Sequence, residues 1–495
     1  MPTPLDQRKL DALRADADRF IAELDEEAYL HYAGHKATYE IVPIYERHEE
    51  LTRLETALDL GASVNGGRNV RELWRFACEG YLGNFVSEED EKIAEAETKT
   101  VQVGDEAIAY RDLRPRIANT DDREERRRLE LAHNEATEEH NALYSRKHQV
   151  VHRESGRLGV PSYTELYRTG FRYPLDDLAE QCRAFLDSTE RLWEDAGDRY
   201  FRSRIGIGLG EIERWDATRV WRGVAWDAAF PKEQMLPALE VTLGDLGVEL
   251  RAQRNVELDL EDRPNKAPRA FCVPIEVPQR VILVIKPQGG PDDWRSLFHE
   301  AGHTEHFAHT SPSLTVEERR LGDNALTEGW AMLLEHLTID PTWLERRLDF
   351  PRPHEYAAEG ATQLLWLLRR YCAKLIYEIE FHAVDDVTTM RQRYVELLAD
   401  ALKVTPSDSD YLADLDEGFY TSSYLRAWAF EAQLRAYLRE TFGNAWFTRR
   451  DAGSLLRELW SEGQKPTADE VLQEVTGATL ELEAAAERIR EALAA

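Results

Sequence analysis

The stretch from Trp294 to His309 (WRSLFHEAGHTEHFAH) constrains this chain more than any other. It contains His299 and Glu300 followed by His303, and residues four apart on a helix lie on one face, so the two imidazoles can converge on one ion. Glu300 can then reach a water held by that ion. The pattern predicts a zinc hydrolase site with a carboxylate general base, and a chance match of a short motif is the alternative.

A catalytic zinc ion needs a third protein ligand, with the fourth position left to water. The first candidate is His309, which follows His303 at the spacing found in metzincins. That pattern requires a glycine where this chain has His306, and it requires a Met-turn, whereas Met332 and Met390 lie in helical sequence. The metzincin arrangement is therefore the weaker alternative.

The second candidate is Glu328, in the apolar helical stretch 324–335. A buried carboxylate needs a partner because an unpaired buried charge is costly, and zinc supplies one. Glu335 lies two turns further on the same face, where it could hold a ligand histidine through its second ring nitrogen. The alternative is that both are ordinary surface carboxylates.

These residues resemble the thimet oligopeptidase and oligoendopeptidase F family of zinc metallopeptidases. The family motif H-E-F-G-H, a small residue, any residue and His is similar to residues 299–306, with Ala301 in place of the phenylalanine. The family's third ligand lies twenty-five residues after the second histidine, which is Glu328 here, and a further glutamate follows at the position of Glu335. The resemblance implies one zinc ion, held by His299, His303 and Glu328.

A second similarity precedes the motif. Residues 266–272 (KAPRAFC) are similar to a Lys-x-x-Gly-Ala-aromatic segment of the family, with Arg269 in place of glycine. The run 280–286 (RVILVIK) then predicts a short strand just before the zinc helix. Such a strand could pair with an extended peptide substrate by β-addition, or it could simply shape the core beside the site.

A tyrosine-rich segment, residues 417–428, completes the resemblance. In the family, tyrosines at about this distance donate hydrogen bonds to the oxyanion that forms when water attacks the peptide carbonyl. Tyr424 matches the last of them, and Tyr420 lies one turn earlier. Amphipathic packing is the ordinary role of such a pair.

Composition narrows the classes of partner. The formal net charge is −31, from 93 acidic and 62 basic residues, so nucleic acid is a poor partner for the surface as a whole. Only 11 of the basic residues are lysine, which together with the acidity is typical of salt-adapted proteins. The four cysteines are well separated, which suggests a reducing compartment. No signal peptide or membrane-spanning run stands out, so we expect a cytoplasmic protein without a membrane partner.

Apolar residues recur at three- and four-residue spacing through most of the chain, which predicts a mainly α fold. Residues 101–110 predict a hairpin, and residues 121–157 predict a long charged helix. Ser162 is expected to begin the next helix, and Asp292 or Asp293 is expected to cap the helix that contains His299. We expect an N-terminal helical region over 1–150 and a catalytic helical region over 151–495, or one continuous two-lobed body. The resemblance implies a large gluzincin-type peptidase body with a small sheet beside the zinc helix and a central substrate cleft.

The sequence thus predicts a zinc-dependent oligopeptidase that hydrolyses short peptides. Glu300 is the expected general base, Tyr424 and Tyr420 are the expected oxyanion donors, and Glu335 is the expected support of a ligand. Two alternatives remain open: a zinc carboxypeptidase or aminopeptidase of related fold, and a non-catalytic peptide-binding helical protein. The oligomeric state is not indicated by any pattern in the chain.

Overall fold

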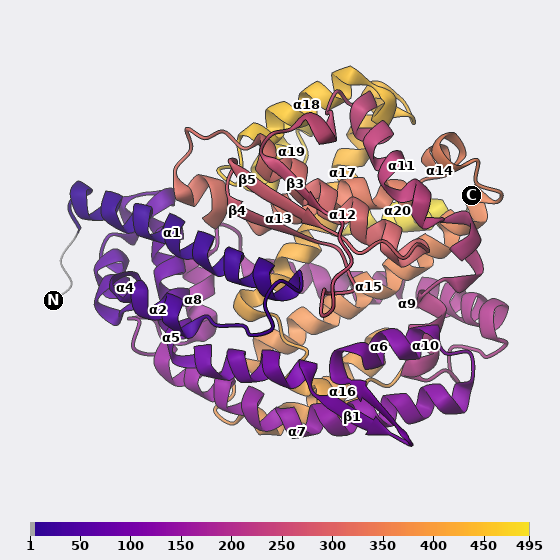
Figure 1. Cartoon of the computed structure of the whole chain (residues 1–495), viewed down its shortest axis with the longest axis horizontal. Helices are drawn as coiled ribbons and strands as arrows, with labels where there is room; N and C mark the ends of the chain where they lie inside the picture. Colours follow the sequence, from indigo (N-terminus) through magenta and orange to yellow (C-terminus); the bar gives the residue numbers. More distant parts are fainter. Residues whose placement is uncertain (1–4, 495) are drawn as a thin grey trace.

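The computed structural model describes residues 5–494, and nearly all of its elements are helices (Figure 1). The helices of the first half are α1 (Gln7–Tyr32), α2 (Val42–Arg47), α3 (Glu49–Thr52), α4 (Leu54–Gly61), α5 (Arg68–Thr98), α6 (Tyr110–Asn119), α7 (Arg123–Ser155), α8 (Tyr163–Gly170), α9 (Leu175–Ile205), α10 (Arg214–Trp221) and α11 (Lys232–Asp245). The helices of the second half are α12 (Pro291–His309), α13 (Asn324–Glu335), α14 (Pro341–Leu348), α15 (Pro353–Phe381), α16 (Arg391–Leu402), α17 (Tyr420–Phe442), α18 (Arg450–Ser461), α19 (Ala468–Thr476) and α20 (Glu483–Ala494). The predicted mainly α class is confirmed.

Local sequence signals place several helix boundaries correctly. The Ser162 side chain accepts a hydrogen bond from the Glu165 backbone N–H and so begins α8, as the sequence predicts. The predicted charged helix is α7, which Asp122 caps. Neither Asp292 nor Asp293 caps α12, which has no side-chain cap. The Asp293 carboxylate instead accepts from the backbone N–H groups of Gln288 and Gly289 and closes the turn before the helix.

Five strands form two small sheets. The predicted hairpin is confirmed as β1 (Thr100–Val103) paired with β2 (Glu106–Ala109). The second sheet has the order β3 (Val256–Asp259), β5 (Arg280–Val284), β4 (Phe271–Glu276), with β5 parallel to β3 and antiparallel to β4. This sheet lies beside α12, where the sequence predicts it.

The proposed pairing of a peptide substrate with the strand at 280–286 is wrong. β5 is the central strand, so the backbone groups on both of its edges are already paired within the sheet. The free edge near α12 belongs to β4, and its own chain uses that edge: the Cys272 N–H donates to Glu300, and the Ile275 carbonyl accepts from Arg320. The strand therefore shapes the core, which is the other role considered.

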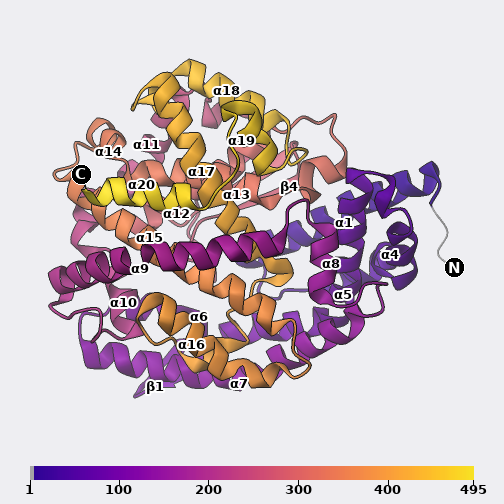
Figure 2. The ribbon, with the colours of Figure 1, turned by 180° about the vertical axis from the view of Figure 1, so that it is seen from behind.

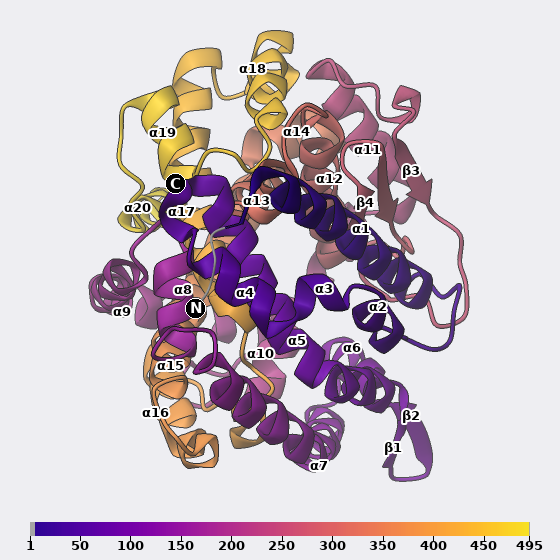
Figure 3. The same ribbon diagram turned by 90° about the vertical axis from the view of Figure 1, so that its left-hand side faces the viewer.

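Most elements pack around one large apolar core that runs from Leu13 to Ile489, and two smaller apolar clusters lie at the three-stranded sheet and at the β1–β2 hairpin. In Figure 1, α12 and α13 occupy the middle, with α18 and α19 above them and α7 with the β1–β2 hairpin below. Seen from behind, α9 crosses the body next to α15 (Figure 2). From the side, α1 runs along the three-stranded sheet and contacts β4 (Figure 3). Residue 150 falls inside α7, and the division at that residue stays a prediction.

α12 and α13 approach each other very closely at Gly302. A Cβ atom built on this residue would lie 2.5 Å from the Ala331 Cα and 2.5 Å from the Trp330 carbonyl oxygen. Both partner atoms are backbone, so neither helix can yield locally. The absent side chain at Gly302 therefore sets the distance between the two helices. No helix within residues 5–494 combines the length and apolarity that crossing a membrane requires.

Gly302→Ala tests this close approach. Alanine in a helix interior normally stabilises by about 1 kcal/mol over glycine. Here we expect the opposite sign, a loss of about 2 kcal/mol in the free energy of unfolding, because the methyl group overpacks the contact between the helices. Denaturant titration would measure it. The control is Gly156→Ala, at a right-handed helical position where the nearest atom to an added Cβ is 3.7 Å away. Equal effects of the two variants would contradict the interpretation.

Candidate metal centre

Three side chains from α12 and α13 converge on one point. The His299 and His303 Nε2 atoms are 3.2 Å apart, and the Glu328 Oε2 atom lies 3.4 Å from the first and 3.6 Å from the second. Within residues 5–494 this is the one group of three or more His, Cys, Asp and Glu side chains whose ligand atoms lie within 4.8 Å of one another. The structure thus brings together the three residues that the sequence predicts as ligands.

The donor set fits a metal ion. Glu328 is 4 % exposed, and its Oε2 atom is buried without a hydrogen-bond partner although it faces two imidazoles. A buried carboxylate oxygen left in this state is costly, and a cation between it and the two Nε2 atoms would satisfy all three. Two histidines and one glutamate around one point are the donor set of catalytic zinc sites.

Further contacts hold each ligand in place. Glu335 Oε2 lies 2.8 Å from the His299 Nδ1 atom, on the side away from the shared point. The Thr327 hydroxyl lies 2.8 Å from the His303 Nδ1 atom. Such outer partners fix the tautomer and orientation of ligand imidazoles. Thr327 is not among the predicted site residues, although its place directly before a candidate ligand was a usable signal.

Glu300 lies beside this group and not within it. Its Oε2 atom accepts a hydrogen bond of 2.8 Å from the Cys272 N–H on β4, which fixes the carboxylate next to the metal-binding side chains. Burial raises the pKa of Glu300 to about 7, so the group can accept and release a proton near neutral pH. That behaviour suits a general base that later acts as a general acid.

The two predicted tyrosines occupy different positions. The Tyr420 hydroxyl donates to Glu328 Oε1 at 2.7 Å, so it is engaged with a ligand. The Tyr424 ring packs edge-on against Tyr420 and Tyr371, and no hydrogen bond within residues 5–494 involves its hydroxyl. Burial and the nearby Glu328 carboxylate raise the pKa of Tyr424, which therefore keeps its proton and remains a donor.

His309 lies away from the site. α12 continues unbroken to this residue, and the imidazole Nδ1 lies 2.9 Å from the Glu305 carbonyl oxygen. Its ring packs against Trp460. A turn of the chain after His303 would be needed to bring it back, and the helix provides none.

A cavity of about 370 Å³ opens beside the metal-binding side chains. His299, Glu300 and Tyr424 line it, together with the arginines Arg269 and Arg295. Ligand cavities of this size are typical of small-molecule and peptide-residue sites. A group placed here would contact the candidate base and the free tyrosine hydroxyl at once.

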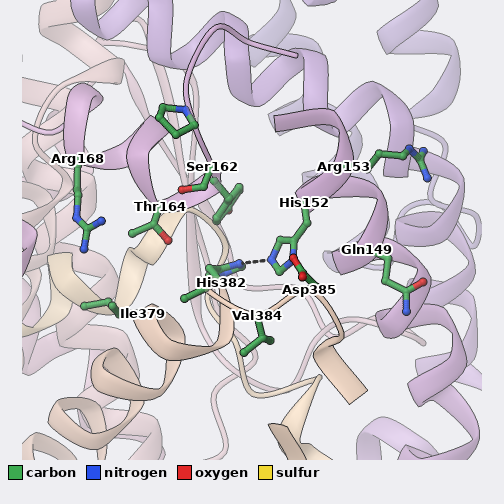
Figure 4. A pocket seen from close by; sticks show the side chains of 13 residues that line it. Gln149, His152, Arg153, Ser162, Thr164, Arg168, Ile379, His382, Val384 and Asp385 are labelled. Carbon is green, nitrogen blue, oxygen red and sulfur yellow. Dashed lines mark hydrogen bonds between the residues drawn. The ribbon is translucent and has the colours of Figure 1, made fainter. Parts of the chain in front are cut away.

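A separate histidine pair lies in another cavity (Figure 4). The His152 Nε2 and His382 Nδ1 atoms are 2.8 Å apart, and burial lowers the pKa of both rings, so both are neutral and share one hydrogen bond. No third ligand joins them among residues 5–494. His382 is a buried histidine.

Structure comparison places the chain among large helical peptidases. It superposes on an oligoendopeptidase F from Bacillus anthracis str. Ames with a TM-score of 0.63 at 16% identity, covering 100% of this chain and 86% of that one. Metallocarboxypeptidase 1 of Trypanosoma cruzi gives 0.59 at 14% identity, with 97% and 99% covered, and a carboxypeptidase of Pyrococcus furiosus gives 0.61 at 13%, with 98% and 99% covered. No protein-family model and no curated protein matches the chain in sequence. The chain thus shares the fold of these metallopeptidase structures at low sequence identity.

Glu328→Ala and His309→Ala together test the ligand set. We expect the purified wild type to carry about one zinc ion per chain, and Glu328→Ala to lose it, because the carboxylate is one of three ligands. His309→Ala is the matched control and keeps the metal, since its ring faces Trp460. Elemental analysis gives the metal content. Loss of zinc in the control with retention in Glu328→Ala would refute this ligand assignment.

Proposed function

We propose that this chain, which has a metallopeptidase fold, is a zinc-dependent peptidase that hydrolyses short peptides. The observation that carries the proposal is the convergence of His299, His303 and Glu328 beside Glu300 at the wall of one cavity. The three side chains would hold a zinc ion, whose chemistry is Lewis acidity toward a peptide carbonyl and an attacking water. A binding protein without catalysis has no use for a buried carboxylate such as Glu300 at this position.

The chain's own groups supply the proton transfers. Glu300 takes a proton from the attacking water and passes it to the leaving amine, for which a pKa near neutrality is suited. The N–H of Cys272 fixes the orientation of this carboxylate.

The two tyrosines have different proposed roles. Tyr424 faces the cavity with a free hydroxyl and would donate to the oxyanion that develops on the carbonyl. Tyr420 is bonded to Glu328, and we propose it as a positioning residue for that ligand in place of the oxyanion role that the sequence suggested.

Glu300→Gln tests the general base. We expect kcat to fall by at least about 10³-fold on quenched-fluorescent peptides, because the amide cannot accept the proton of water. Zinc content should stay at the wild-type value, since Glu300 is not among the three converging ligands. A chelator-treated wild type is the second control and should be equally inactive. Substantial turnover by Glu300→Gln would remove Glu300 from its assigned role.

Tyr424→Phe and Tyr420→Phe form a matched pair that separates the two roles. Loss of the Tyr424 hydroxyl should lower kcat by about 10²- to 10³-fold with zinc affinity unchanged, as for an oxyanion donor. Loss of the Tyr420 hydroxyl should instead weaken zinc affinity by about 10- to 100-fold, because Glu328 loses its outer partner. Steady-state kinetics and competition with a zinc indicator measure the two quantities. Identical profiles for the two variants would refute the division.

A further inference from the structure

Arg295 is a guanidinium without a carboxylate partner inside the cavity beside the metal-binding residues. It lies on α12 one turn before His299, so both side chains project from the same face. Its Nη1 donates to the Gln363 side-chain oxygen, and its Nε is buried without a hydrogen-bond partner. No ion pair within residues 5–494 includes Arg295, although the chain is strongly acidic.

The carboxylates that line the same cavity are already engaged. Asp292 pairs with Arg269 at 3.1 Å, and Glu335 lies 2.8 Å from the His299 ring. Glu300 accepts the N–H of a β4 residue. The charges of Glu335 and Asp292 reach Arg295, but neither carboxylate forms an ion pair with it. The guanidinium can therefore still pair with a carboxylate that enters from outside.

The position of this cavity identifies which part of a peptide would bring that anion. Glu300 lines the cavity and hands its proton to the leaving amine, so the residue that carries this amine lies on the Glu300 side. Tyr420, which holds Glu328, lines a different cavity. Apolar side chains also line the cavity, namely Met332, Ile339, Leu364, Leu367 and Trp428. The cavity thus offers apolar contacts together with Arg295, whereas its other arginine, Arg269, is paired with Asp292.

We propose that Arg295 is a specificity-determining residue that binds a carboxylate of the peptide on the leaving-group side of the scissile bond. This inference rests on the proposed peptidase function and narrows its substrate class to peptides with a carboxylate within reach of the leaving residue. The carboxylate is either the free C-terminus of a short leaving group, with its apolar side chain against the apolar residues of the cavity, or the side chain of an acidic residue.

Matched substrates separate the two sources. One pair of peptides shares a sequence and ends in a free carboxylate or in an amide. The second pair has an amidated end and carries Glu or Gln directly after the scissile bond. We expect wild type to prefer the charged member of one pair by about 10- to 100-fold in kcat/KM, the range of a hydrogen bond to a charged group. A preference within the first pair shows that Arg295 binds the C-terminal carboxylate, and a preference within the second pair shows that it binds an acidic side chain.

Arg295→Met should abolish that preference by raising KM for the charged peptide, while kcat/KM for its uncharged partner stays within about twofold. Arg295→Lys keeps the charge and should recover part of the preference. Arg346→Met is the control, since Arg346 is exposed on α14 and contacts neither the cavity nor the metal-binding residues. Zinc content and the midpoint of thermal unfolding verify that each variant is folded.

A binding measurement separates failure of this inference from failure of the proposed function. Calorimetric titration of Glu300→Gln with the dipeptide Phe-Leu and with its amide reports binding without turnover. Tighter binding of the acid, lost in the double variant with Arg295→Met, supports the subsite even if no peptide is hydrolysed. Equal binding of acid and amide, or equal kcat/KM within both peptide pairs, overturns the subsite while leaving peptide hydrolysis intact.

Discussion

The convergence of His299, His303 and Glu328 depends on the closeness of two helices. α12 carries two histidines and α13 carries the glutamate, and these three side chains meet only because Gly302 lets the backbones touch. Even one added methyl group would lie 2.5 Å from backbone atoms of α13, too close for the ligands to keep their separations of 3.2–3.6 Å. Backbone contact at one glycine therefore fixes the geometry on which the proposed chemistry rests.

Buried carboxylates and imidazoles surround that contact and form hydrogen bonds that offset the cost of burying them. Glu328 has one oxygen on the Tyr420 hydroxyl and the other facing the imidazoles, and Glu335 holds His299 from outside. Burial would disfavour such carboxylates, but hydrogen bonding to His299 offsets this and lowers the pKa of Glu335 to about 2. Glu300 is the exception, because burial dominates there and raises its pKa. The same surroundings thus give Glu335 and Glu300 different roles, and within residues 5–494 they leave Arg295 hydrogen-bonded to Gln363 but without an ion pair.

Much of the fold and of the site could be predicted from the sequence because the signals are local. The histidine spacing, the helical periodicity, the hairpin and the Ser162 cap each depend on a few neighbouring residues. The prediction for β5 failed because its pattern gives a strand but not its neighbours, and the sheet order placed it in the centre. The prediction that Asp293 caps α12 failed for a similar reason, since its carboxylate accepts hydrogen bonds from the turn before the helix.

The sequence by itself determined the identity of the chemical groups: two histidines and a glutamate one helical turn apart or less, a distant glutamate on an apolar helix, and tyrosines on a third helix. Only the tertiary structure decided which of these groups meet. In the folded chain Glu328 lies next to the two histidines, whereas His309 lies away from them. The Tyr420 hydroxyl donates to Glu328, and the Tyr424 hydroxyl forms no hydrogen bond within residues 5–494. Arg295 lines the cavity without an ion pair to any residue in that range. The physical reason is that helix spacing fixes contacts along one helix, whereas contacts between helices depend on how whole surfaces pack.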